Sequence, residues 1–222
     1  MLPALIIVGS LVFVGLIIAA VIYGEKKRTE ALEKVATDLS LSFSKKHDET
    51  LLATMQRFKL FNQGHSKKMK NVMQADAEIA RLSIFDYQFT TGGGQHSHVH
   101  VQTVIAMESD DLTLPNFRIR PEGFFDRVGS ALGFQDIDFD DDKAFSDAYV
   151  LSGDDEEAIR TFLSPELRKM LVEHTKCCVE SDHGVFIFYR SGRRKPDQIR
   201  ELMDEGFGVY TAFREALAEE NS

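Results

Sequence analysis

Residues 77–107 read AEIARLSIFDYQFTTGGGQHSHVHVQTVIAM, and they contain two β-rich runs separated by three consecutive glycines. The first run, 77–90, is dense in Ile, Leu, Phe and Tyr, and the second, 96–107, alternates polar residues with Val and Ile. Glycines between two such runs are typical of a β-hairpin tip. A phosphate-binding loop would need a following helix that carries Lys and then Ser or Thr, and that pattern is absent. This stretch therefore predicts an antiparallel hairpin.

Weaker patterns on both sides of this hairpin predict the rest of an α+β fold. The segment 50–61 fits a helix or a strand equally well. Helices are expected where a proline or an acidic first turn opens an apolar-periodic run, and Gly206 and Gly208 are expected to bend or divide the last of them. The fold class is thus a mostly antiparallel sheet with flanking helices, after an N-terminal transmembrane helix. The expected elements are strands at 41–44, 112–120 and 145–151, a second hairpin from 177–180 and 185–189, and helices at 121–132, 155–163, from Ser164 and from Pro196.

The chain begins with a long apolar segment, residues 2–23, that contains no charged side chain. As a helix it would be about 33 Å long, enough to cross a bilayer core. A signal peptide would have a basic start and a small-residue cleavage site, which are absent here. A buried core helix of this length would normally keep one polar face. We therefore expect residues 1–24 to form a single-pass transmembrane anchor in the cell membrane.

The charges beside this segment predict its orientation. Lys26, Lys27 and Arg28 follow it, and no basic residue precedes it. Because basic flanks stay on the cytoplasmic side, the amino terminus should lie outside and the main domain in the cytoplasm. Tyr23 fits an interfacial aromatic, and the three cations can reach anionic head groups. The expected membrane flank is thus Tyr23, Lys26, Lys27 and Arg28.

The next segment, 25–40, repeats apolar residues at helical spacing and predicts a juxtamembrane helix. Its apolar face can lie against the domain or pair with a second copy of the chain. Gly15 and Ala19 form a small-residue pair that permits helix–helix contact in a membrane, although such pairs are also common without any contact. The predicted partners are therefore the lipid bilayer and, through the anchor and this helix, a second copy or another protein.

Composition limits the remaining part of the chain. Roughly 198 residues follow the anchor, which suits one medium domain. We assign it to 41–218, with two lobes near 41–135 and 136–218 as an alternative and 219–222 as a frayed tail. The net charge of −9 argues against nucleic acid as a partner. The only cysteines, Cys177 and Cys178, are adjacent and cannot join distant parts of the chain.

Three histidines form the sharpest candidate site. His96, His98 and His100 alternate, so in a strand they would share one face and could supply ligands to zinc or a similar metal. The alternative is a polar strand face opposite Val99 and Val101, as a one-sided antiparallel sheet requires. Neighbours on one face also lie ~6–7 Å apart, and no fourth ligand is identifiable.

Three other features are weaker candidates for a functional site. The acidic run 136–142 superficially matches a calcium loop, but Asp141 stands where the sharp turn requires Gly. Cys178 with His174 could form a reactive thiol, whereas such cysteines are more often small core residues. Asp86, between Phe85 and Tyr87, is expected on the opposite face of its strand.

Several motifs together resemble an uncharacterised group of bacterial single-pass membrane proteins, over most of the chain. The group carries no activity that could be transferred, so the resemblance implies a single folded unit and nothing about mechanism. The motifs that follow the anchor are Phe85-Asp86-Tyr87-x-Phe89-Thr90-Thr91-Gly92, Gln102-Thr103-Val104, Leu114-Pro115-x-Phe117, Pro121-Glu122 and Phe145-Ser146-x-x-Tyr149-x-Leu151-x-Gly153.

These features favour a non-enzymatic function: a membrane-tethered adaptor or regulatory module at the cytoplasmic face, without a cofactor. The alternative is a metal-dependent hydrolase that uses His96, His98 and His100. An enzyme should bring these imidazoles together with a carboxylate in a concave pocket. An adaptor should leave them facing solvent.

Overall fold

The computed structural model describes residues 2–123, 136–173 and 176–220, and within these ranges it describes side chains from Val12 to Glu219. One eight-stranded sheet forms the body of the molecule, and every pairing between its described strands is antiparallel. The strand order is β1-β2-β3-β4-β8-β7-β5-β6. The strands are β1 Ser42–Ser44, β2 His65–Asp76, β3 Arg81–Thr91, β4 His98–Glu108, β5 Phe117–Pro121, β6 Tyr149–Gly153, β7 Cys177–Asp182 and β8 Val185–Arg190.

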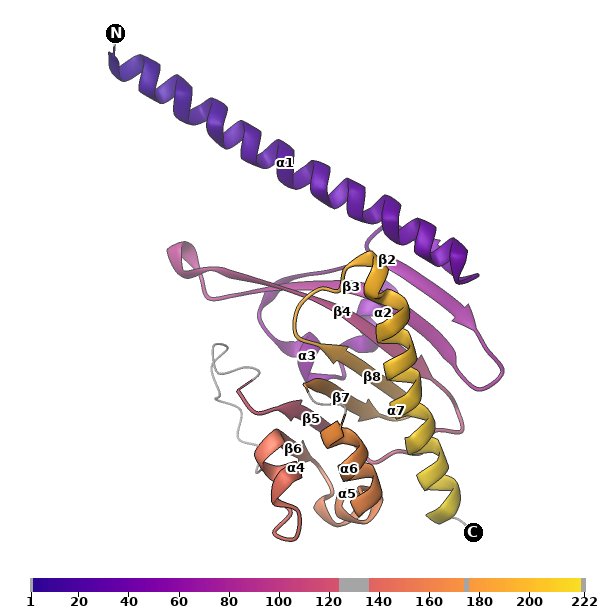
Figure 1. The fold of residues 1–222 in the computed structure, drawn as a ribbon. Coiled ribbons are helices and arrows are strands. Elements are labelled where there is room, and N and C mark those ends of the chain that lie inside the picture. Colours follow the sequence, from indigo (N-terminus) through magenta and orange to yellow (C-terminus); the bar gives the residue numbers. More distant parts are fainter. Residues whose placement is uncertain (1, 124–135, 174–175, 221–222) are drawn as a thin grey trace.

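Helices cover both faces of this sheet (Figure 1). Two short ones pack on one face, and the carboxyl-terminal end of the first helix packs on the other together with the last helix. The helices are α1 Leu2–Asp38, α2 Glu49–Met55, α3 Lys59–Asn62, α4 Lys143–Ala148, α5 Glu156–Phe162, α6 Pro165–Glu173 and α7 Ile199–Glu220, with 3₁₀ turns η1 Gly94–His96 and η2 Pro196–Gln198.

Two cores result from the alternation of side chains along the strands. In β8, Phe186 and Phe188 belong to the core under α1 and α7, while Ile187 and Tyr189 belong to the core under α2 and α3. Because both faces are covered, the central strands are apolar on both sides. Any polar side chain in them is then buried and needs a partner.

Several expected elements are confirmed, among them both hairpins, the short strand β1, and helices α5 and α6. The strand expected at 145–151 is wrong in its first half, since α4 occupies 143–148 and β6 begins at Tyr149. The strand expected from 112 begins only at Phe117. The helix expected at 121–132 lies mostly outside the described residues. The segment 50–61 resolves into α2 and the start of α3.

Both expected lobes contribute to the same sheet. Strand β5, from the segment 41–135, lies between β6 and β7, which come from the segment 136–218. The last helix, α7, runs without a break through Gly206 and Gly208, so the expected division there is wrong.

Helix α1 is continuous from the expected anchor into the domain, and its amino-terminal half extends away from the sheet (Figure 1). Leu32 and Ala36, at its other end, are buried in the core. Side chains of residues 2–11 of the expected anchor lie outside the described set. Among the described residues, no helix combines the length and the apolar character needed to cross a membrane.

Candidate functional site

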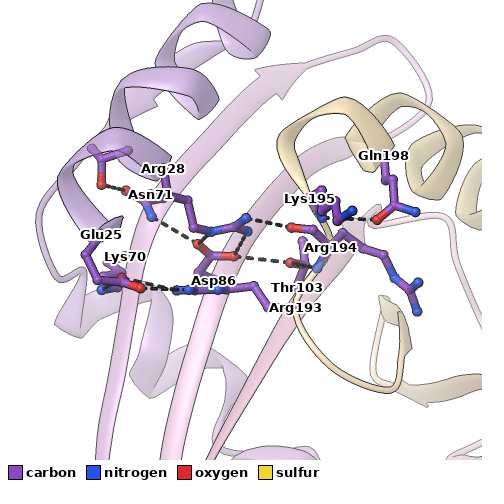
Figure 2. A network of polar contacts seen from close by, with 11 residues as sticks. Glu25, Arg28, Lys70, Asn71, Asp86, Thr103, Arg193, Arg194, Lys195 and Gln198 are labelled. Carbon is purple, nitrogen blue, oxygen red and sulfur yellow. Dashed lines mark hydrogen bonds and ion pairs between the residues drawn. The ribbon is translucent and has the colours of Figure 1, made fainter. Parts of the chain in front are cut away.

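Asp86 lies at the centre of a polar network that joins α1 to the sheet (Figure 2). Its side chain points from β3 toward α1 and is 4 % exposed. Arg28 donates two hydrogen bonds to the carboxylate, from Nε to Oδ2 at 2.9 Å and from Nη2 to Oδ1 at 2.7 Å. Such a two-pronged, charge-assisted pair holds a definite geometry. As expected, Asp86 is on the face opposite Phe85 and Tyr87, but α1 covers that face and buries it.

A bulge in β2 supplies the next member of the network. The register between β2 and β3 shifts between Lys70 and Met73, and Asn71 within this shift has a positive φ of 54°. Asparagine tolerates this left-handed conformation better than most residues. Because bulges re-aim side chains, Asn71 can donate to Asp86 Oδ2 at 3.0 Å and accept from Thr29 Oγ1 at 2.9 Å. The bulge therefore connects α1 to β2 as well as to β3.

The third connection runs through β4 to the segment that follows β8. Thr103 is the direct partner of Asp86 in the sheet, and its hydroxyl donates to Asp86 Oδ1 at 3.1 Å. The same hydroxyl accepts the backbone N–H of Arg194 at 2.9 Å. The carbonyl of Arg194 in turn accepts Nη1 of Arg28 at 2.6 Å. Residue pairs separated by 58, 91 and 166 positions in the chain thus meet at one point.

A second ion cluster lies one helical turn toward the amino terminus. The Glu25 carboxylate accepts hydrogen bonds from the Arg193 guanidinium at 2.7 and 3.1 Å, and from Lys70 at 2.5 Å. The hydrogen bond from Arg193, followed by that from Lys70, lowers the pKa of Glu25 to about 2, against the opposing effect of partial burial. Two basic groups far apart in the sequence, on β2 and after β8, therefore converge on this turn of α1.

We call these nine residues the junction network. Its one hydroxyl beside a carboxylate, that of Thr103 on Asp86, is buried, and the same carboxylate is bound by Arg28 and Asn71. The network attaches α1 to the strands β2, β3 and β4 and to the loop after β8. Its members are Glu25, Arg28, Thr29, Lys70, Asn71, Asp86, Thr103, Arg193 and Arg194.

The expected membrane flank is divided by this network. Tyr23, Lys26 and Lys27 are exposed, as an interfacial position requires. Arg28 is only 10 % exposed, and its guanidinium is occupied by Asp86 and the carbonyl of Arg194. Its expected role at the head groups is therefore not what the structure shows. The sequence predicts a basic residue at this position, but it does not reveal that Arg28 pairs with Asp86, which lies 58 positions further along the chain.

The three histidines do not form one strand face. His96 lies in the turn η1, whereas His98 and His100 lie in β4. His100 stacks on Phe89 with ring centroids 4.8 Å apart, and its Nε2 lies 2.8 Å from the hydroxyl of Thr91. Burial and the neighbouring His98 lower the pKa of His100. Across the described ranges, no group of three His, Cys, Asp or Glu side chains could hold a metal ion.

The remaining candidate residues, the two cysteines and the acidic run, lie in surroundings that suit a structural role. Cys177 and Cys178 are buried in opposite cores, and burial raises the pKa of both thiols, which makes them poor nucleophiles. His174 lies outside the described residues. In the acidic run, Asp141 and Asp142 each bind the buried guanidinium of Arg168 at 2.9 Å. The positive charge that these two carboxylates face is therefore the guanidinium of Arg168 and not a calcium ion.

The fold defines an antiparallel-sheet α+β domain with a long amino-terminal helix bound to one of its faces. No family model and no curated protein matches the chain. Among solved structures, the crystal structure of the mycobacterial trehalose monomycolate transport factor A, TtfA, is similar, with a TM-score of 0.60 and 14 % sequence identity. The alignment covers 86 % of this chain and 94 % of that one. At this identity the similarity concerns the fold alone.

Proposed function

We propose that this chain is a single-pass membrane protein whose α+β domain acts as a non-enzymatic adaptor or regulatory module at the cytoplasmic face. The observation that carries the proposal is the contrast between the two parts of α1. From Val12 to Tyr23 its large apolar side chains are 50–69 % exposed on all sides of the helix. From Glu25 onward the same helix is ion-paired and packed into the domain.

An apolar helix surface without a partner is unfavourable in water and favourable in lipid. The 2–23 segment as a whole has the length and the uncharged composition of an anchor. The exposed cations Lys26 and Lys27 directly follow it, which favours a cytoplasmic domain. The junction network would then transmit the position of the anchor to the sheet.

The similarity in fold supports the adaptor part of the proposal. The protein of the similar structure is named as a factor in the transport of trehalose monomycolate. We extend to this chain the idea of an accessory factor, without its cargo. The junction network, in which Arg28 pairs with Asp86 and Glu25 pairs with Arg193 and Lys70, is consistent with a structural role.

Membrane fractionation tests the anchor. The full chain should stay in the membrane pellet after extraction at high pH. Val12→Arg combined with Leu16→Arg should release it, because each arginine near the bilayer centre costs about 3 kcal/mol. The control is Lys27→Arg combined with Lys34→Arg, which adds guanidinium groups outside the anchor and should leave the chain in the pellet. Recovery of the unchanged chain in the supernatant would refute the proposal.

Topology is tested separately with reporters at the carboxyl terminus. A fluorescent protein that folds only in the cytoplasm should be bright, and a phosphatase that is active only outside it should be inactive. The opposite pattern would leave an anchor but place the domain on the other side of the membrane.

A further inference from the structure

The tip of the β3–β4 hairpin is a second candidate for contact with the membrane. We define the hairpin tip as residues 91–99, which include three glycines and the turn η1. Strand β8 pairs with β4 only from Val104 onward, so the hairpin extends beyond this neighbour. Figure 1 shows it projecting on the same side as the free half of α1.

The contacts of α1 fix this common direction. The carboxyl end of α1 leads into β1, which pairs with β2 at Val72 to Gln74. Thr29 then bonds Asn71, and Glu25 bonds Lys70. Toward its amino terminus, α1 therefore advances along β2 toward His65. His65 pairs with Thr90, next to the hairpin tip. The free half of α1 and the hairpin tip thus leave the junction network in the same direction.

The reach of the two segments can be compared from the Arg28–Asp86 pair. Tyr23 is five helical residues from Arg28, about 7.5 Å along the axis. Thr91, the last residue of β3, is five extended residues from Asp86, about 17 Å along the strand. Even with about 60° between the axes, the strand would advance about 8 Å along the helix direction. If the bilayer begins at Tyr23, the hairpin tip therefore reaches the head groups.

The composition of this end of the sheet suits an anionic surface. The chain carries a net charge of −9, yet no Asp or Glu occurs in 62–75 or in 87–107. Exposed groups there include Lys68 on β2 and His96 and His98 at the tip, with Val99 62 % exposed. Basic side chains next to a membrane are attracted by anionic lipid, and an exposed apolar side chain can enter the interface.

We propose that the hairpin tip, with Lys67 and Lys68 beside it, docks on anionic lipid head groups next to the anchor and fixes the tilt of the domain. This inference rests on the proposed function, because the reach is estimated for an anchor that enters the bilayer at Tyr23. It assigns a role to the glycine run and to the exposed histidines. Three glycines allow the tip to approach the lipid surface closely, since they add no side chains.

The test uses the full chain in nanodiscs with single-cysteine labels. Ser97→Cys places an environment-sensitive fluorophore at the hairpin tip, and Glu78→Cys places it at the β2–β3 turn, the other end of the same strand. Ala20→Cys reports on the anchor itself. The native cysteines are fully buried, and the unsubstituted chain measures their labelling background. The discs contain phosphatidylcholine with or without phosphatidylglycerol, and some lipids carry a nitroxide quencher at the head group.

The proposal expects quenching at positions 20 and 97 but not at 78, and stronger quenching at 97 when phosphatidylglycerol is present. Replacing Lys67 and Lys68 by Gln should lower the docked-to-undocked ratio about fivefold per lysine. Replacing the distant Lys169 and Lys176 by Gln is the matched control and should change nothing.

Each other outcome has a defined meaning. Quenching at 20 without quenching at 97 overturns the docking of the tip and leaves the anchor intact. Absence of quenching at 20 overturns the proposed function and the tip proposal together. Quenching at 97 that ignores phosphatidylglycerol overturns the anionic specificity. Protection of position 97 in native membranes but not in discs would indicate a protein partner and also overturn the proposal.

Discussion

Arg28 is largely buried, and its guanidinium binds the carboxylate of Asp86 in place of water. The pair is therefore sensitive to substitutions that remove only one of the two partners. Two ions removed from water lose solvation that only their mutual attraction and further hydrogen bonds replace. Asp86 has those further bonds from Asn71 and Thr103. The pair therefore specifies where α1 binds the sheet, and its net contribution to stability depends on both partners being present.

Removing one partner should consequently be costly. Arg28→Ala is expected to lower the free energy of unfolding by about 3 kcal/mol, because it leaves a buried carboxylate with no counter-ion. Denaturant titration of the full chain in a mild detergent measures this. Lys26→Ala, which removes only an exposed pair with Glu30, should change stability by less than about 0.5 kcal/mol. Equal effects of the two variants would contradict the role given to Arg28.

Glu25 makes a second prediction, on pH. Its pKa falls from an ordinary 4.5 to about 2 in the folded chain, mainly through the hydrogen bond from Arg193. The carboxylate therefore contributes stability above about pH 4.5, and this contribution is lost as the pH falls toward 2. Glu25→Gln should flatten the decline of the unfolding midpoint over this window, and Arg193→Ala should do the same. An unchanged slope in both variants would show that the ion cluster does not form.

At the scale of single elements, Gly206 and Gly208 show why a division of α7 is wrongly predicted from the sequence. Both were expected to bend or divide α7, because glycine weakens helices. In the structure, a Cβ at Gly206 would lie 3.1 Å from Phe188 and 3.2 Å from Ile105, so this glycine lets α7 approach the sheet closely. A Cβ at Gly208 would meet nothing within 4 Å. Only tertiary packing distinguishes the two positions.

The pair yields a matched prediction. Gly208→Ala should raise the free energy of unfolding by about 0.5–1 kcal/mol, because alanine restricts the unfolded chain and favours the helix. Gly206→Leu should lower it by about 1–3 kcal/mol, because the added atoms must displace packed side chains. Thermal unfolding of the two variants checks both signs. Stabilisation by both substitutions would contradict the close approach of α7.

The helix α4 illustrates the opposite error. Residues 145–151 contain Phe, Tyr, Val and Leu, and they predict a strand from composition. The side chain of Asp142 accepts the backbone N–H of Phe145 and caps a helix there instead.

The hairpins were predictable because their signals are local. The junction network was not, since its contacts join residues that the sequence leaves 58 to 166 positions apart.

At the scale of the whole molecule, the two halves of α1 contribute differently to the stability of the fold. Side chains from Val12 to Tyr23 are exposed, whereas Leu32 and Ala36 are among the most buried in the core. A chain that starts at Glu25 should therefore unfold within about 0.5 kcal/mol of the full chain, the range typical of changes outside packed contacts. A chain that starts at Leu39 loses the core residues and the junction network and should not fold cooperatively. Circular dichroism during denaturation distinguishes these results.

Helix α1 continues from residue 2 to residue 38 without interruption, so the proposed anchor and the sheet cannot rotate independently of each other. Each residue of an α-helix turns the chain by about 100° and advances it by about 1.5 Å. One residue added after Gly24 would therefore swing the sheet about 100° around the anchor axis, whereas seven would restore its bearing to within about 20° and lift it about 10 Å. A protein partner that touches both the proposed anchor and the sheet would tolerate the longer insertion better than the shorter one.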